Sequence, residues 1–303
     1  MRQIVLTGQE EKVAADSAFS ATQDDPTSWL DLQALCCQAV GGDLALTIPA
    51  TAAWYLLYAA AHLLDHLEDQ DELPAALAGY SPGELINAAT GLLFSACLAL
   101  DDLFTAEYLE DIPRITRQIS RDFSCSVLRM AGGQQRDMRT AEPSLEDWFE
   151  IAEAKSGSFF ALACRSGARW GTADPGRIEG FGRFGNHLGV ILQLRDDISD
   201  LSPALLSGKR PAEFGRSLAA AYARSVLPPD GKAQLSRLIQ ALPADSGASN
   251  DLVALLDSCG TALYLQMEIE RQRGKALAAL QAADPAQPAR DALRGLLHGL
   301  VEF

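Results

Sequence analysis

The chain has 303 residues, of which 48% are hydrophobic and 21% charged, and its formal net charge is -15. This composition excludes a disordered or fibrous chain and provides enough apolar residues for a sizeable core. The negative charge disfavours nucleic acid and anionic lipid as partners, because both would be repelled.

The first strong signal along the chain is the apolar run from Ala52 to Ala61, AAWYLLYAAA, which leads directly into HLLDHLEDQDE. This uninterrupted run is too short to cross a bilayer, and the start of the chain, MRQIVLTGQEEKVAADS, lacks the apolar core of a secretory signal. We therefore expect a cytoplasmic protein without stable membrane insertion. The six cysteines contain no C-x-x-C pair, so neither a disulfide framework nor a zinc knuckle is expected.

Helix signals dominate the remainder of the chain. Three segments open with capping residues or with proline in the first turn, namely Ser81 with Glu84, Ser144 with Asp147, and Asp174 with Pro175. Strand signals are limited to QIVLT near the start. The breaks between helical segments are short, so we predict one all-α domain over residues 29–303, preceded by a flexible segment over residues 1–28.

Two pairs of aspartates stand out because each pair shares one face of a predicted helix. Asp65 and Asp69 are four residues apart, and so are Asp196 and Asp200, with Asp197 beside the first of them. Like charges at this spacing destabilise a helix unless a cation neutralises them. Both pairs follow apolar sequence, which is unusual for a solvated surface.

Carboxylate oxygens suit a hard cation such as Mg²⁺, which often completes its shell with substrate phosphates. The distribution of positive charge favours the same reading, because no lysine or arginine occurs between Lys12 and Arg114. A solvated acidic surface would also explain that stretch, but its side chains cannot bind a phosphate without metal. The two acidic helices together predict a clamp for a diphosphate.

These motifs resemble those of a known family. LLDHLED and LGVILQLRDDISDL are similar to the two aspartate-rich motifs of the trans-isoprenyl diphosphate synthase (polyprenyl synthetase) family. Three further segments occur in the family's order, since GGQQRDM resembles its Gly-Gln-x-x-Asp segment, EAKSGSFFALACRSGA its Lys-Thr helix, and SGKRPAEFGRSLAAAYA its Gly-Lys segment. The resemblance covers roughly residues 30–280.

The resemblance implies a single-domain helical bundle of the isoprenoid synthase type with a central apolar cavity. It implies three Mg²⁺ ions, an allylic prenyl diphosphate as substrate and a homodimer. The implied metal ligands are Asp65, Asp69, Asp196 and Asp200. The implied catalytic residues are these four with Asp197, Lys155 and Lys209. The implied substrate-binding residues are Lys155, Lys209, Gln193, Gln134 and Arg195.

Three departures from the family pattern stand out, and the two that remove cations concern the second substrate, isopentenyl diphosphate. His66 replaces the second of two adjacent aspartates, Asp43 stands where a cation is expected, and an Arg-Arg pair is missing after the first motif. We therefore expect a terpene synthase-like enzyme that ionises an allylic diphosphate and cyclises, deprotonates or hydrates the carbocation. The alternatives are a chain-elongating trans-prenyl diphosphate synthase, a prenyltransferase with another acceptor and, with the least support, a non-catalytic regulatory subunit.

The histidines allow several readings. His66 could be a metal ligand, a general base or a neighbour turned about 100° away from Asp65 around the helix, and we favour the last. His62 and His66 are four residues apart, but Leu63 replaces the glutamate of H-E-x-x-H, which argues against a zinc protease. His187 is expected to be a core residue.

Overall fold

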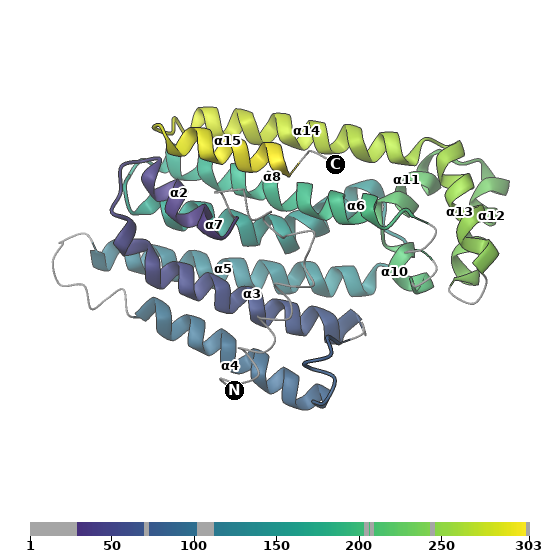
Figure 1. Cartoon of the computed structure of the whole chain (residues 1–303), viewed down its shortest axis with the longest axis horizontal. Helices are drawn as coiled ribbons and strands as arrows, with labels where there is room; N and C mark the ends of the chain where they lie inside the picture. The colour runs from purple at the N-terminus through teal and green to yellow at the C-terminus, as the bar shows by residue number, and fades with distance from the viewer. Residues whose placement is uncertain are drawn as a thin grey trace. The chain divides into compact units, whose positions relative to one another are not determined.

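The computed structural model describes residues 29–69, 73–101, 112–202, 206, 209–242 and 246–300. Within these ranges the chain contains helices and turns but no strand. Figure 1 labels the helices α2 (Leu32–Gln38), α3 (Ile48–Asp69), α4 (Pro82–Asp101), α5 (Ile112–Arg139), α6 (Leu145–Ala152), α7 (Ser158–Arg169), α8 (Pro175–Ser199), α10 (Pro211–Gly215), α11 (Leu218–Val226), α12 (Pro229–Ala241), α13 (Ser246–Ser258), α14 (Thr261–Ala282) and α15 (Ala289–Gly299). Short 3₁₀ helices cover Trp29–Asp31 and Leu44–Thr47. The predicted flexible segment and the β-prone QIVLT lie outside the described residues.

The predicted helix starts are confirmed. The Ser81 hydroxyl donates to the Glu84 carboxylate at 2.7 Å, and the same carboxylate accepts the Ser81 amide at 2.9 Å, directly before α4. Ser144 and Asp147 form a reciprocal capping box at α6. These side chains satisfy amide groups that have no partner within the first helical turn, which fixes where each helix begins.

Contacts within the chain divide it into two compact units. Of the described residues, unit 1 contains those up to 125 together with 162–181 and 283–296, and unit 2 contains 126–161, 182–282 and those from 297 onward. Four of the five boundaries fall inside α5, α7, α8 and α15, so neither unit is one continuous stretch of sequence. The predicted single domain over residues 29–303 stays a prediction.

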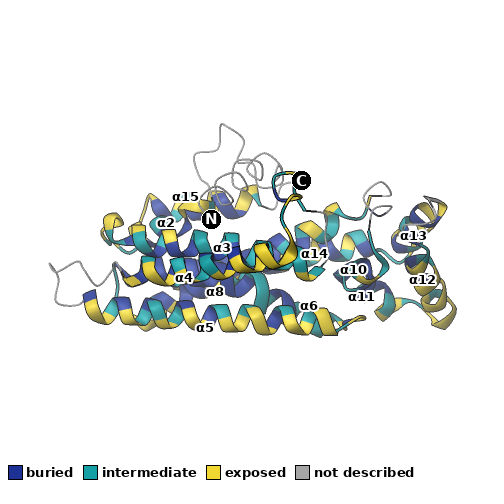
Figure 2. Cartoon of the chain, turned by 90° about the horizontal axis from the view of Figure 1, so that it is seen from below, coloured by how far each residue is buried: buried dark blue, intermediate teal, exposed yellow. Residues whose placement is uncertain are grey.

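Unit 1 is built on the pairing of α3 with α4, which run side by side in opposite directions (Figure 1). Ala60 and Ala89 are fully buried where the two helices meet, and Leu92 packs beside them. Small residues at this contact allow the helix backbones to approach closely. In the unit 1 part of α5, the buried residues Ile112, Thr116, Ile119 and Phe123 recur at helical spacing, and Figure 2 shows buried and exposed residues alternating along this helix.

Helices α3 and α4 are unusually apolar. By length and composition alone, the segments Leu44–Asp69 and Pro82–Asp101 reach the level of a membrane-spanning helix, with mean hydropathies of 1.4 and 1.5. The uninterrupted apolar stretch of residues 52–61 is too short to span a membrane, because it ends at the first polar residue. The mean hydropathy of a longer segment is still high, because it averages over the polar residues within it. The absence of membrane insertion therefore stays a prediction.

In unit 2, a π-helical turn over Glu153–Gly157 separates α6 from α7. This turn packs closely against α8. A Cβ atom added to Gly189 would lie 2.4 Å from the Ser156 carbonyl oxygen, so only glycine permits the contact. Such π turns often occur at functional sites, and this one contains Lys155.

Candidate functional site

The first acidic motif lies on the last two turns of α3, in unit 1. Asp65 and Asp69 are both half-buried there. The rings of His62 and His66 meet edge to face with centroids 4.2 Å apart, and the His66 Nδ1 lies 3.1 Å from the His62 carbonyl oxygen. Tyr58 stacks on His62 one turn earlier, with ring centroids 5.9 Å apart. The last turns of α3 therefore carry a tyrosine ring, two imidazoles and two carboxylates.

The second acidic motif lies at the end of α8, in unit 2. Asp196 is exposed, whereas Asp197 is half-buried and its Oδ2 accepts the Leu218 amide at 2.5 Å. Leu218 is the first residue of α11, so the Asp197 carboxylate connects the end of α8 to the start of α11. Asp197 thus has a structural partner that the sequence did not indicate.

Lys209 binds two carboxylates in the same region. Its Nζ lies 2.9 Å from the Asp200 Oδ2 and 2.5 Å from the Glu213 Oε1. Burial lowers the pKa of Lys209, but the hydrogen bonds to Glu213 and Asp200 outweigh it, so the pKa is raised overall. The ammonium group is therefore fixed as a charged donor next to the second motif.

Lys155, on the π turn, donates to the Asp137 Oδ2 at 2.8 Å. Its neighbour Ser156 donates to the Gln193 Oε1 at 2.7 Å, which orients the Gln193 amide. The two side chains of the Lys155–Asp137 pair are 21% and 20% exposed, so solvent screens this pair less than a surface ion pair. Asp137 was not among the predicted site residues, although it belongs to the GGQQRDM segment.

Gln134 contributes an unusual feature, because both polar atoms of its amide are buried without a hydrogen-bond partner. Leaving a buried amide unpaired is costly, so such a group indicates a position that a ligand or water completes. Arg195 is half-buried on α8. Gln134 is the predicted substrate-binding residue whose surroundings point most directly to a missing partner.

The structure brings some predicted residues together within unit 2, namely Lys209 with Asp200, and the Lys155 segment with Gln193. Asp65 and Asp69 belong to unit 1, so the clamp between the two motifs stays a prediction. Within the described ranges, no three His, Cys, Asp or Glu side chains already converge on one metal-sized site. The donor set nevertheless fits Mg²⁺, since it consists of carboxylate oxygens with ammonium groups beside them to share a diphosphate.

Asp197 allows a prediction of pH dependence. Burial raises its pKa to about 8, with Asp200 and Asp196 adding to the shift and the Leu218 amide opposing it. In the unfolded chain an aspartate carboxyl has a pKa near ~3.9. Between that pH and about pH 8, Asp197 is protonated in the folded protein but ionised in the unfolded chain. The free energy of unfolding therefore falls as the pH rises through this range. Asp197 keeps partial solvent access, which reduces the size of this effect. Between about pH 5 and about pH 8, we expect the free energy of unfolding to fall by about 1–3 kcal/mol more in the wild-type protein than in Asp197→Asn. Urea unfolding at a series of pH values measures this, and parallel pH profiles for the two proteins would contradict it.

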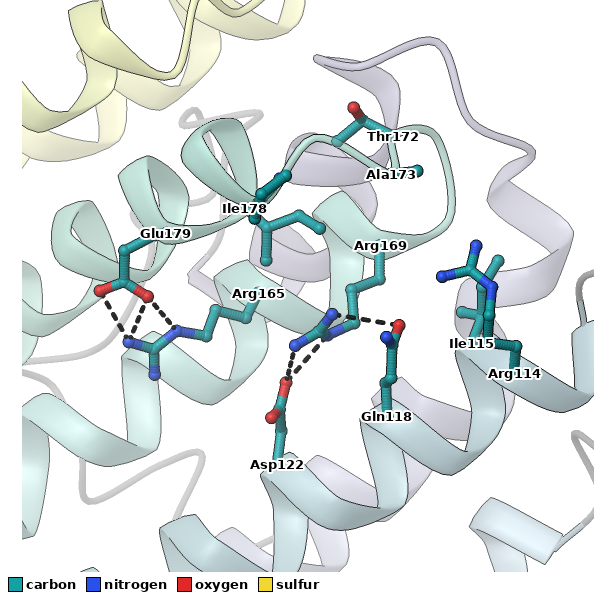
Figure 3. A pocket seen from close by; sticks show the side chains of 11 residues that line it. Arg114, Ile115, Gln118, Asp122, Arg165, Arg169, Thr172, Ala173, Ile178 and Glu179 are labelled. Atoms are coloured by element: carbon teal, nitrogen blue, oxygen red, sulfur yellow. Dashed lines mark hydrogen bonds and ion pairs between the residues drawn. The ribbon is translucent and has the colours of Figure 1, made fainter.

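A separate pocket of about 410 Å³ lies in unit 1 and contains none of the predicted site residues. Figure 3 shows its polar wall, where Arg169 binds Asp122 at 2.7 Å and Gln118 at 3.2 Å, and Arg165 binds Glu179 at 3.0 Å. These pairs connect α7 to α5 and to α8. We interpret the pocket's arginines as structural.

The better-shielded pair of this pocket should matter more for stability. The Arg169 and Asp122 side chains are 17% and 25% exposed, against 29% and 48% for Arg165 and Glu179. Asp122→Ala leaves a shielded guanidinium without its carboxylate, so we expect a loss of about 1–3 kcal/mol in the free energy of unfolding. Glu179→Ala, the matched control, should cost less than about 1 kcal/mol. Urea denaturation measures both, and equal losses would show that shielding does not distinguish the pairs.

Comparison with known proteins gives one consistent family. Residues 31–241 match the family described as polyprenyl synthetase. The chain is 26% identical over 197 residues to the geranylfarnesyl diphosphate synthase of Methanosarcina mazei, which covers 63% of this chain and 62% of that enzyme. It is 28% identical over 161 residues to IDS-like terpene synthase 1 of Melampsora lini, which covers 50% of this chain and 47% of that protein.

The fold also matches solved structures. Geranylgeranyl pyrophosphate synthetase from Pyrococcus horikoshii superposes with a TM-score of 0.81 at 19% identity, over 99% of this chain and 90% of that chain. At this identity the likeness concerns the fold. The predicted all-α fold of the isoprenoid synthase type is thereby confirmed.

Proposed function

This chain belongs to the polyprenyl synthetase family, and from that premise we propose that it is a prenyltransferase that extends an allylic prenyl diphosphate with isopentenyl diphosphate. The names of its relatives support this reading, since the archaeal enzymes above are a geranylfarnesyl diphosphate synthase and a geranylgeranyl pyrophosphate synthetase. The comparisons therefore favour chain elongation over the cyclisation that the sequence alone suggested.

The observation that carries the proposal is the charge arrangement at the end of α8. Lys209 lies between the carboxylates of Asp200 and Glu213, and the exposed Asp196 is on the last turn of α8. An ammonium group already balanced by carboxylates can turn toward a diphosphate when cations occupy those carboxylates. Such an arrangement is suited to a metal-bound diphosphate.

Each group then has a defined task. Asp65, Asp69, Asp196 and Asp200 would bind Mg²⁺, which would supply the charge that stabilises a departing diphosphate. Lys155 and Lys209 would donate hydrogen bonds to the diphosphate oxygens. The amides of Gln134 and Gln193 would orient the substrate next to them. Apolar side chains of α3 would keep water from the reacting carbon.

A terpene synthase activity is the second candidate, and one sequence observation favours it. No lysine or arginine occurs from residue 13 to residue 113, where family members that use isopentenyl diphosphate have cations. An unneutralised second diphosphate there would face only acidic groups, which costs free energy. The resemblance to the IDS-like terpene synthase is consistent with this candidate.

One assay distinguishes the candidates. The protein is incubated with Mg²⁺ and geranyl, farnesyl or geranylgeranyl diphosphate, each with and without isopentenyl diphosphate, and the products are separated by chain length. Longer diphosphates formed only with isopentenyl diphosphate support elongation. Hydrocarbon or alcohol formed from one allylic substrate alone supports the terpene synthase. No turnover in any mixture would contradict both and favour another acceptor or a regulatory subunit.

A homodimer is also part of the proposal. The α4 face away from α3 exposes Ile86, Phe94 and Leu98, with Phe94 69% exposed. Apolar residues repeated at helical spacing on a surface commonly mark a contact with another protein, and a second copy of the chain would cover them. We expect Phe94→Asp to lower the dimer fraction at least tenfold in analytical ultracentrifugation. Thr90→Asp, one turn away on the same exposed face, should have a smaller effect because it removes no large apolar side chain. A wild-type protein that stays monomeric at all concentrations would contradict this.

A further inference from the structure

The pocket of about 410 Å³ in unit 1 has a positively charged lining, in a chain whose formal net charge is -15. Three arginines and two carboxylates contribute to this lining, namely Arg114, Arg165, Arg169, Asp122 and Glu179. The arginines therefore exceed the carboxylates by one charge. Fixed positive charge around a cavity raises the local concentration of anions, so an anionic ligand is the kind that this pocket would attract.

The ion pairs of this pocket are structural, but they use only part of the available donors. Arg165 binds Glu179 through Nε and Nη2, and Arg169 donates to the Gln118 Oε1 through Nη1. Within the described part of the chain, neither the Arg165 Nη1 nor the Gln118 Nε2 donates to a protein acceptor. Both groups can donate to a ligand, and a guanidinium already held in place loses little conformational entropy when it does so.

The turn before α8 adds a hydroxyl donor to the pocket. Thr172 Oγ1 accepts the Asp174 amide at 3.1 Å, so the hydroxyl proton is left for another acceptor. Figure 3 shows that the polar lining thus comes from α5, α7 and this turn. A carboxylate would share only two oxygens among these donors, whereas a phosphate group presents three strong acceptor oxygens. The lining therefore favours a phosphate group.

Apolar side chains form the remainder of the lining, namely Ile115, Ala173, Pro175 and Ile178. Sites for small molecules commonly combine such apolar walls with a few well-placed polar groups. A ligand with a short apolar chain would remove these side chains from water, which inorganic phosphate alone cannot do.

We propose that this pocket binds a small ligand that carries a phosphate or diphosphate group on a short apolar chain. The guanidinium groups and the Gln118 amide donate to the phosphate oxygens, and Ile115 and Ile178 contact the apolar chain. No metal ion is needed, because the arginines supply the positive charge. The inference does not rest on the proposed function, since the pocket contains none of the residues assigned to the reaction.

Calorimetric titration in the presence of EDTA tests this site. EDTA removes the divalent cations that the aspartate motifs would need, whereas the arginines keep their charge. The full-length protein is titrated with isopentenyl diphosphate, with inorganic diphosphate and with the uncharged alcohol isopentenol. Isopentenyl diphosphate should bind, inorganic diphosphate should bind about tenfold more weakly because it lacks the apolar chain, and isopentenol should not bind detectably. Absence of isopentenyl diphosphate binding, or equal binding of isopentenol, would overturn the inference.

Three arginine variants locate the bound probe. Arg114→Gln and Arg165→Gln should each weaken isopentenyl diphosphate binding about tenfold, because each removes a charged donor from the lining. Arg117→Gln is the matched control, since Arg117 is exposed on α5 but does not line the pocket, and its loss should change the affinity less than about twofold. Thermal unfolding verifies that each variant is folded. Equal affinity losses in all three variants would show attraction by general charge and would contradict a site in the pocket.

Lys209→Met separates this site from the proposed diphosphate site. Lys209 belongs to unit 2 and does not line the pocket, so the variant should retain the binding measured in EDTA. Loss of that binding would assign the probe to the Lys209 region and overturn the inference. Elongation activity without binding in EDTA would keep the proposed function and exclude the pocket site. Binding in EDTA that depends on Arg114 and Arg165, without any turnover, would keep the pocket site and exclude the proposed function.

Discussion

Replacing Asp65 or Asp196 with asparagine is expected to lower turnover by about two to three orders of magnitude at saturating substrate. An amide keeps the shape of the side chain but loses the charge that binds a hard cation, so the departing diphosphate loses its main electrostatic stabilisation. The folded protein should be unaffected or slightly stabilised, because Asp65 and Asp69 repel each other across one helical turn. Steady-state kinetics with varied Mg²⁺, alongside thermal unfolding, measure both effects.

Glu68→Gln is the matched control for the first motif. Glu68 is exposed on the same turn of α3 and lies about 60° from Asp65, on the side away from Asp69. The Glu68→Gln substitution removes one negative charge from the helix and leaves the Asp65–Asp69 pair intact, so turnover should change less than about twofold. Full activity in Asp65→Asn, or an equal loss in Glu68→Gln, would contradict the assignment of Asp65 as a metal ligand.

Local sequence signals were sufficient for the helices. Ser81 with Glu84 and Ser144 with Asp147 start helices where they were expected, because a capping box satisfies amides only three residues apart and needs no distant partner. The two D-x-x-x-D pairs were equally visible, since their spacing alone places both carboxylates on one face. These features depend on neighbours along the chain, which sequence patterns report directly.

The partners of the site residues depend on distant segments and were not predictable in that way. Lys155 is bound to Asp137, and Ser156 to Gln193 thirty-seven residues later, through packing of the π turn on α5 and α8. The link from Asp197 to the start of α11 joins residues 21 apart. Helical periodicity indicates which face is buried but does not indicate which helix covers it.

The surroundings of His66 also required the structure. Helical geometry predicts a side chain turned about 100° away from Asp65. The structure adds that its ring Nδ1 lies 3.1 Å from the His62 carbonyl oxygen.

Lys209→Met should have the second-largest effect, on both activity and stability. The Lys209 side chain is 24% exposed between Asp200 and Glu213, so its loss leaves two partly shielded carboxylates without their cation. We expect the free energy of unfolding to fall by about 1–3 kcal/mol and kcat/KM to fall by about two orders of magnitude, because the diphosphate loses a charged donor. Since Lys209 also lowers the pKa of Asp197, its removal should strengthen the loss of stability with rising pH.

Lys209→Arg distinguishes these contributions. It keeps the positive charge, so most of the stability and the pH profile should return. A guanidinium spreads its charge over a planar fork and cannot replace the compact ammonium donor at one diphosphate oxygen, so recovery of kcat/KM should be incomplete. Adding Mg²⁺ with inorganic diphosphate should stabilise the wild-type protein more than Lys209→Met in thermal unfolding. Equal stabilisation of both proteins would show that Lys209 serves the α8–α10 connection alone and does not bind the diphosphate.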